Sequence, residues 1–189
     1  MGFDTNNGEK VGKFSCFINS YYIIILLTCK MIAENIKNIN ILLADDDDAD
    51  CLLFKEALEE LPVSATLTIV HDGEQLIEEI SKKGNKLPDV LFLDLNMPLK
   101  NGFASLELIK RSTELQDLPV VIYTTSSNEE MVKNVFRNAA HYYICKPNDF
   151  LQLKKVIYEA LILITQKNNL PLKEKFMITG NSIIIPDKQ

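Results

Sequence analysis

Asp89-Val-Leu-Phe-Leu-Asp94-Leu-Asn-Met-Pro98 is the stretch that decides the fold of this chain. Residues 90–93 and Leu95 are apolar, and Asp94 is the one carboxylate among them. Such a short apolar run predicts a buried strand, and Pro98 stops it because proline cannot donate a hydrogen bond to a sheet. Asp94 is therefore expected at the C-terminal end of that strand, where ligands bind in open α/β sheets. Taken alone, Asp94 is equally well explained as a residue that caps the following turn.

The composition is typical of a globular chain with an acidic balance. Of the 189 residues, 47% are hydrophobic and 24% are charged, which favours a folded core over disorder. The net charge of -6 argues against direct binding to nucleic acid, which needs a basic surface. The four cysteines are far apart, so no zinc site is expected, and a reduced, cytoplasmic setting is predicted. They are Cys16, Cys29, Cys51 and Cys145.

Three regions are predicted along the chain. Residues 1–36 are expected to be an N-terminal extension outside the fold, residues 37–167 one domain, and residues 168–189 a C-terminal tail. The apolar run over 14–29 is interrupted by polar residues and is shorter than the ~20 residues that a spanning helix needs. A membrane anchor is therefore the less favoured alternative. Within the tail, the pattern over 178–183 is compatible with a small hairpin.

Strand and helix patterns alternate through the central region. Short apolar runs predict strands, and apolar residues at helical spacing predict the helices between them. Five strand–helix pairs with short connections predict an α/β fold, a doubly wound parallel sheet with right-handed crossovers. The expected strands are 39–44, 66–70, 90–93, 120–124 and 142–145, and the expected helices are 49–61, 73 to about 84, about 104–111, 128–138 and 150–165.

Carboxylates also follow the first predicted strand. Asp48 is expected to cap the next helix, and Asp50 to complement its dipole. Capping does not account for Asp45 and Asp46, which precede the helix at the same sheet edge as Asp94. Three carboxylates at one edge repel one another unless a divalent cation lies between them, and Mg²⁺ prefers such oxygen ligands. The pattern therefore predicts a magnesium site.

Hydroxyl and ammonium groups follow the last two strands. The fourth ends at Thr124, with Ser126 close behind as a candidate helix cap. The fifth ends at Lys146, which follows an apolar run and is pinned by Pro147. A metal and a lysine at one edge can neutralise phosphoryl oxygens, and a hydroxyl can donate a hydrogen bond to them. We therefore expect this edge to bind a phosphoryl group.

Together these motifs resemble the receiver domains of bacterial response regulators, over residues 39–165 and in the family's order. The motifs are Asp45-Asp46 after a strand, Phe-Leu-Asp94-Leu-Asn-Met-Pro98 with Gly102, Val-Ile-Tyr-Thr124, and Tyr143-Ile-Cys-Lys146-Pro147. The resemblance implies a flavodoxin-like strand order of 2-1-3-4-5 and is strongest to the stand-alone subgroup that lacks an output domain. One departure is Ala139, which stands where the family usually has glycine.

What the resemblance implies about the site is specific. Asp94 would accept a phosphoryl group from a sensor histidine kinase or a phosphotransfer protein, with Mg²⁺ as cofactor. The implied metal ligands are Asp45, Asp46, Asp94 and the backbone carbonyl of Asn96. The implied phosphoryl-binding residues are Thr124 and Lys146, the switch residues are Thr124 and Tyr143, and the supporting turn residues are Pro98, Gly102 and Pro147.

The same resemblance implies a signalling module that catalyses only its own phosphorylation and dephosphorylation. Output is expected through protein–protein contacts, with self-association as one form of it. A haloacid-dehalogenase-like phosphatase carries its nucleophile on the first strand and a second aspartate two residues later, where this chain has Asn96. A flavodoxin-like cofactor site is disfavoured because four consecutive aspartates repel a phosphate. A phosphate sink or an unphosphorylated pseudo-receiver is the remaining alternative.

Overall fold

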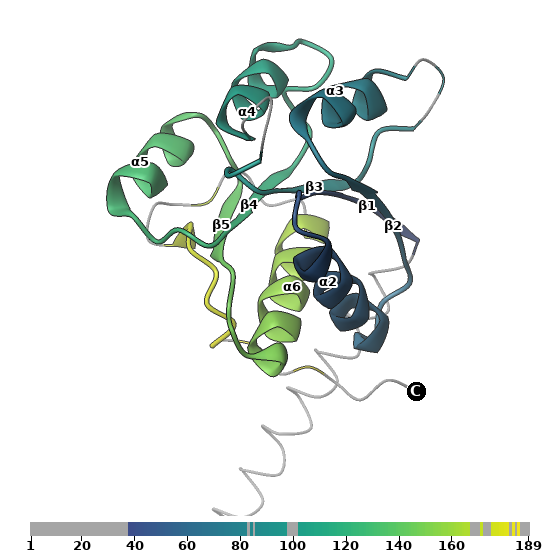
Figure 1. The fold of residues 1–189 in the computed structure, drawn as a ribbon, viewed down its shortest axis with the longest axis vertical. Helices are drawn as coiled ribbons and strands as arrows, with labels where there is room; N and C mark the ends of the chain where they lie inside the picture. The colour runs from purple at the N-terminus through teal and green to yellow at the C-terminus, as the bar shows by residue number, and fades with distance from the viewer. Residues whose placement is uncertain are drawn as a thin grey trace, which may run out of the picture.

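The computed structural model describes residues 38–82, 84, 86–97, 102–166, 171, 175–181, 183 and 185. In this part of the chain, five parallel strands form one sheet in the order β2-β1-β3-β4-β5 (Figure 1). The strands are β1 Ile39–Ala44, β2 Ala65–Val70, β3 Val90–Leu93, β4 Val120–Thr124 and β5 Tyr142–Cys145. The helices are α2 Asp48–Glu60, α3 Gly73–Ser81, α4 Gly102–Arg111, α5 Glu129–Arg137 and α6 Phe150–Thr165. The predicted doubly wound α/β fold and its strand order are confirmed.

The sheet is buried on both faces at its centre because helices cover each side. Helices α2 and α6 lie on one face, and α3, α4 and α5 lie on the other (Figure 1). Every residue of β3 and β4 is buried. On the first face, the Phe54 ring of α2 packs edge-on against Phe92 and Tyr123, with ring centroids 4.9 and 5.5 Å apart. A continuous apolar run is what a strand covered on both sides requires.

The register of the central strands positions the acidic residues. Ala44 of β1 pairs with Leu93 of β3, and the next residues in each strand are Asp45 and Asp94. The Asp94 backbone N–H donates to the Ala44 carbonyl at 2.9 Å, which continues the ladder by one more bond. Asp45 and Asp94 therefore lie side by side at the C-terminal edge of the sheet.

Helix starts differ slightly from the sequence expectation. The cap of α2 is Asp47, whose Oδ1 accepts from the backbone N–H groups of Ala49 at 2.8 Å and Asp50 at 3.2 Å. The expectation that Asp48 caps this helix was wrong, because Asp47 is the last residue with an extended backbone. Helix α5 is likewise capped by Asn128, and not by Ser126.

The turn before β5 has a left-handed backbone at Ala139, with φ of +57°. Glycine adopts this conformation freely, whereas alanine at such a position costs about 1–2 kcal/mol. Ala139 therefore carries backbone strain in this turn.

The described part of the C-terminal tail does not form the expected hairpin. Met177 instead forms a parallel bridge with Tyr143 at the edge of β5. The N-terminal extension over 1–36 and the supporting residue Pro98 lie outside the described residues. Among the described residues, no helix is long and apolar enough to cross a membrane.

Candidate functional site

Three carboxylates gather where β1 and β3 end. One oxygen from each of Asp45, Asp46 and Asp94 lies within 4.8 Å of the others. Asp45 and Asp94 are buried, whereas Asp46 is exposed. Burial raises the pKa of Asp45 to about 6, although the neighbouring Lys146 ammonium opposes that change. The sequence prediction that these residues lie together is confirmed by this geometry.

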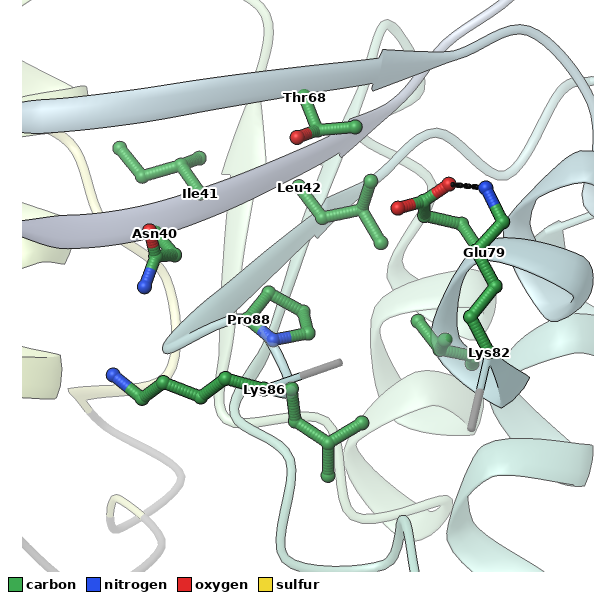
Figure 2. A pocket seen from close by; sticks show the side chains of 10 residues that line it. Asn40, Ile41, Leu42, Thr68, Glu79, Lys82, Lys86 and Pro88 are labelled. Carbon is green, nitrogen blue, oxygen red and sulfur yellow. Dashed lines mark hydrogen bonds and ion pairs between the residues drawn. The ribbon is translucent and has the colours of Figure 1, made fainter. Parts of the chain in front are cut away.

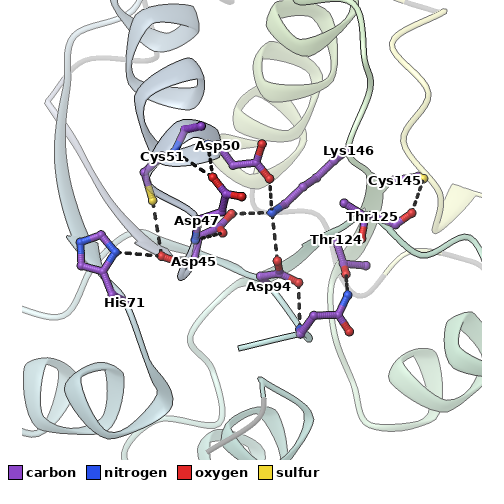
Figure 3. Close-up of polar contacts among 12 residues, drawn as sticks. Asp45, Asp47, Asp50, Cys51, His71, Asp94, Thr124, Thr125, Cys145 and Lys146 are labelled. Carbon is purple, nitrogen blue, oxygen red and sulfur yellow. Dashed lines mark hydrogen bonds and ion pairs between the residues drawn. The ribbon is translucent and has the colours of Figure 1, made fainter. Parts of the chain in front are cut away.

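The Lys146 side chain reaches the same cluster from the end of β5 (Figure 3). Its ammonium nitrogen lies 2.7 Å from Asp45 Oδ2 and 2.9 Å from Asp94 Oδ2, and the side chain is only 6% exposed. Burial alone would lower the pKa of Lys146, but hydrogen bonds to the surrounding carboxylates raise it above its ordinary value. Lys146 therefore stays charged and neutralises part of the buried negative charge.

Asp50 also binds this lysine, which the sequence analysis missed. Its Oδ2 lies 2.7 Å from the Lys146 nitrogen, although Asp50 was expected only to complement the helix dipole. Asp50 belongs to the first turn of α2, and three residues separate the end of β1 from the start of this turn. A carboxylate at that point of the turn lies over the sheet edge, so the short strand–helix connection was the available signal.

The Thr124 hydroxyl lies at the end of β4 and is fully buried. It accepts a hydrogen bond from the Asn96 side-chain amide at 3.2 Å, and the Asn96 backbone N–H donates to Asp94 Oδ1 at 2.9 Å. Asn96 thus links the β3 carboxylate to the β4 hydroxyl. Four strands consequently contribute polar side chains to one site.

Tyr143 is the second residue of β5 and is fully buried. Its hydroxyl donates to the Ser126 carbonyl oxygen at 2.6 Å, in the loop between β4 and α5. The ring of Tyr143 therefore occupies an inward position. Residues Thr124 and Tyr143 come from adjacent strands, β4 and β5.

Gly102 supports the site through its lack of a side chain. A Cβ at this position would overlap the Asp94 carbonyl oxygen and lie 2.9 Å from the Leu95 Cα. The Gly102 N–H donates to the Leu95 carbonyl at 3.3 Å. Helix α4 can begin this close to the acidic cluster only because residue 102 is glycine. Pro147, the other supporting residue that is described, directly follows Lys146 and is half-buried.

Comparison with known proteins agrees with this geometry. The sequence profile of the response regulator receiver domain matches residues 41–158. The chain belongs to this family. Receiver domains are signalling modules of two-component systems. The motifs at the strand ends predicted such a domain, and the prediction is confirmed.

Relatives of this receiver domain include two proteins that are named as regulators. It is 32% identical over 122 residues to a probable methanogenesis regulatory protein, FilR2 of Methanothrix harundinacea, covering 63% of this chain and 79% of that protein. It is 32% identical over 121 residues to response regulator Rcp1 of Synechocystis, covering 62% of this chain and 82% of Rcp1.

Solved structures of two such regulators match the fold. The phosphorylated cyanobacterial phytochrome response regulator RcpA superimposes with a TM-score of 0.64 at 29% identity, covering 71% of this chain and 99% of that one. The Mn²⁺-bound form of Rcp1 superimposes with a TM-score of 0.62 at 30% identity, with the same coverage.

Two further side chains of this receiver domain contact the backbone of Asp45. The Cys51 thiol and the His71 ring each approach the Asp45 carbonyl oxygen, at 3.4 and 3.1 Å (Figure 3). Burial raises the pKa of Cys51 to about 12, so this thiol stays protonated and can donate. No pattern in the sequence pointed to either contact, because both depend on how α2 and the β2–α3 loop fold back over β1.

A separate pocket of about 140 Å³ lies at the opposite end of the sheet (Figure 2). It opens beside Asn40, Thr68 and Pro88, and the ion pair of Lys82 with Glu79 borders it. None of the residues around the acidic cluster lines this pocket. This pocket is therefore separate from the acidic cluster at the C-terminal edge of the sheet.

Proposed function

We propose that this receiver domain accepts a phosphoryl group on Asp94 from a sensor histidine kinase or a phosphotransfer protein. The observation that carries the proposal is the pairing of Asp94 with Lys146 at 2.9 Å, inside a cluster of carboxylates at the C-terminal edge of the sheet. This arrangement supplies a nucleophilic carboxylate next to a cation that can take over a phosphoryl oxygen.

The acidic cluster fits a hard divalent cation. Its donors are all carboxylate oxygens within 4.8 Å of one another, and the buried Asp45 has a raised pKa that a cation would lower again. We infer that Asp45, Asp46 and Asp94 bind Mg²⁺, with the backbone carbonyl of Asn96 as a further ligand. When bound, the ion would neutralise charge on the transferred phosphoryl oxygens. The Mn²⁺-bound structure of Rcp1 supports this donor chemistry by likeness.

The reaction is a transfer from nitrogen to oxygen. An Asp94 carboxylate oxygen attacks the phosphorus of a phosphohistidine, so that an O–P bond forms and the N–P bond breaks. The electron pair of the broken bond stays on the imidazole nitrogen of the donor. Lys146 then pairs with a phosphoryl oxygen in place of Asp94, and the Thr124 hydroxyl donates to another. Attack of water on the phosphorus of the acyl phosphate breaks the O–P bond, releases inorganic phosphate and restores the Asp94 carboxylate. We infer that the domain catalyses only this phosphorylation and dephosphorylation of itself.

We infer that the output is a change in protein–protein contacts. Movement of the Thr124 hydroxyl toward a phosphoryl group would alter the space available to Tyr143 and shift the balance between two packings. The partner is then a kinase, a phosphotransfer protein or a second copy of this chain. We also propose that the protein acts in the cytoplasm. This compartment keeps thiols reduced, which agrees with the free thiols of Cys51 and Cys145.

We also propose that residues 37–167 are the functional receiver domain and that residues 1–36 lie outside it. The first strand begins at Ile39, and the family profile begins at residue 41. Deletion of residues 1–30 should leave the melting temperature and the extent of phosphorylation unchanged. Loss of soluble protein on deletion would contradict these boundaries.

The acceptor is tested by labelling with acetyl phosphate or with a phosphorylated histidine kinase. Label should appear only with Mg²⁺, and Asp94→Asn should abolish it. Asp47→Asn is the matched control, because asparagine caps a helix as well as aspartate and Asp47 belongs to the same run of carboxylates. Incorporation that survives EDTA or Asp94→Asn would overturn the assignment. Labelling that leaves every binding partner unaffected would indicate a phosphate sink.

A further inference from the structure

The C-terminal segment Phe176–Gly180 pairs with the free edge of β5 in the manner of a short additional strand. The Tyr143 N–H donates to the Phe176 carbonyl, and the Ile178 N–H donates to the Tyr143 carbonyl, both at 2.9 Å. This pair of bonds makes the parallel bridge between Tyr143 and Met177. The segment runs alongside β5 in Figure 1, where it is drawn in yellow. It thereby satisfies backbone groups that an edge strand otherwise exposes.

Side chains of the segment also contact the domain. Phe176 is 1% exposed, and its ring centroid lies 5.1 Å from that of Phe136 on α5. Ile178 is buried in the core on the other face of the sheet, against α2 and α6. The segment therefore contributes one large side chain to each of the two apolar cores.

The C-terminal end of the segment is hydrogen-bonded to side chains of α6. The Gly180 N–H donates to Glu159 Oε2 at 2.9 Å, and the Gln152 side-chain amide donates to the Thr179 carbonyl. Gly180 has φ of +70°, and a Cβ there would lie 2.8 Å from the Lys155 Cβ. Only glycine satisfies both conditions. The backbone at residue 180 can therefore approach α6 this closely because the residue is glycine.

Phe176 also contacts the Tyr143 ring, with centroids 6.2 Å apart. Tyr143 is fully buried, and its hydroxyl is bound to the Ser126 carbonyl. The segment therefore covers the ring from outside and favours the packing in which the ring lies inward. One residue, Tyr143, receives both the backbone pairing and the ring contact of the segment.

We propose that the edge of β5 is a strand-accepting interface filled by the chain's own residues 176–180, and that its occupancy and phosphorylation of Asp94 strengthen each other. This coupling rests on the proposed function. A phosphoryl group that draws the Thr124 hydroxyl toward Asp94 makes room for an inward Tyr143, and the segment stabilises that same position. Two ligands that favour one packing bind with positive cooperativity.

Amide hydrogen exchange on the full chain tests the coupling. Beryllofluoride with Mg²⁺ serves as the phosphoryl mimic, and the probes are the N–H groups of Tyr143 and Ile178. Their exchange should slow together by about 5- to 150-fold, the range of typical coupling between two sites. Unchanged or faster exchange at both amides, with the mimic bound, overturns the coupling alone. Failure of the mimic to bind overturns the proposed function and the coupling with it.

Reciprocity gives a second test on variants. Phe176→Ala should weaken beryllofluoride binding by the same factor by which the mimic protects the segment. The matched control is Met177→Ala, because Met177 is the next residue and is 45% exposed. Gly180→Ala tests the same step without removing a core side chain, and it should weaken binding in the same direction. Equal affinities for Phe176→Ala and Met177→Ala would overturn the coupling.

The source of the strand is checked by concentration. Protection of the Ile178 amide should not depend on protein concentration, because the segment pairs with β5 of its own chain. Protection that rises with concentration, together with formation of a dimer, would show that a second copy supplies the strand and would overturn the intrachain interface.

Discussion

The Lys146 ammonium nitrogen lies 2.7 Å from the Asp50 carboxylate, although the two residues are 96 positions apart in the chain. A lysine has three N–H donors, and three carboxylates surround this one: Asp45, Asp50 and Asp94. A phosphoryl oxygen must therefore compete with these carboxylates for the ammonium group. Asp50 is the competitor that is neither the acceptor nor an inferred metal ligand.

Replacing Asp50 with asparagine should strengthen binding of the phosphoryl mimic. A neutral amide oxygen holds Lys146 less strongly than a carboxylate, by about 1 kcal/mol, which corresponds to a gain of about fivefold in beryllofluoride affinity. Calorimetric titration in Mg²⁺ measures it. Asp48→Asn is the control, since Asp48 is an exposed acid of the same helical turn. Equal affinities in the two variants would rule out competition by Asp50.

Replacing Lys146 with methionine should make folding depend on Mg²⁺. Without the ammonium, the carboxylates of the site repel one another, and loss of one partner from a buried ion pair costs about 3–5 kcal/mol. Bound Mg²⁺ should recover part of that loss, so the melting temperature should rise more with Mg²⁺ in the variant than in the wild type. Lys154→Met, which removes the 2.7 Å pair with Glu60 far from the cluster, should show no such excess. A Lys146→Met protein that is equally stable in EDTA and in Mg²⁺ would contradict the metal site.

Replacing Ala139 with glycine should stabilise the protein. The φ of +57° at Ala139 costs alanine about 1–2 kcal/mol in the folded state. Glycine also makes the unfolded chain more flexible, which lowers the free energy of unfolding by about 0.5–1 kcal/mol. The expected net gain is therefore about 0.5–1 kcal/mol in the free energy of unfolding, measured with urea. Ala140→Gly, at the buried neighbour with no positive φ, should destabilise the protein instead. A loss of stability in Ala139→Gly would show that this turn is not strained.

His141 should make stability fall in mild acid. Its Nδ1 accepts from the Val120 N–H at 3.2 Å, and burial followed by the nearby Lys110 charge lowers the pKa of the histidine to about 4. Between pH of about 6.5 and about 4 the unfolded chain therefore binds a proton that the folded chain does not. The free energy of unfolding should drop there by about 1.4 kcal/mol per pH unit and show no change from this group above pH of about 6.5.

The variant His141→Asn isolates that effect. Asparagine can accept from the Val120 N–H without titrating, so the difference in stability between wild type and variant should carry the pH dependence of the histidine. Subtraction is needed because the raised pKa of Asp45, about 6, acts with the opposite sign, adding stability as pH falls. A difference that stays constant from pH 7 to pH 4.5 would contradict a neutral, buried His141.

Much of the fold was predictable from local patterns. The apolar runs ending at Ala44, Leu93, Thr124 and Cys145 predicted four strand ends at the observed residues. Parallel strands separated by helices must all end at one edge, so the sequence alone predicted that Asp45, Asp94 and Lys146 lie together. Periodicity and strand direction suffice for such a prediction because they depend on neighbours along the chain.

Other features depended on contacts between distant segments. Asp50 was predicted only to complement the helix dipole, because its neighbours in the chain give no sign of a contact with a lysine 96 positions away. Residues 168–189 were predicted to be a tail, with a small hairpin as a possibility over 178–183. In the structure, Phe176 and Ile178 pack into the two cores and pair with the Tyr143 backbone. Backbone pairing at a free sheet edge does not require particular residue types, so the sequence does not predict it. Local sequence therefore determined the strands, the helices and the composition of the site, whereas only tertiary packing decided which carboxylates share Lys146 and which segment covers β5.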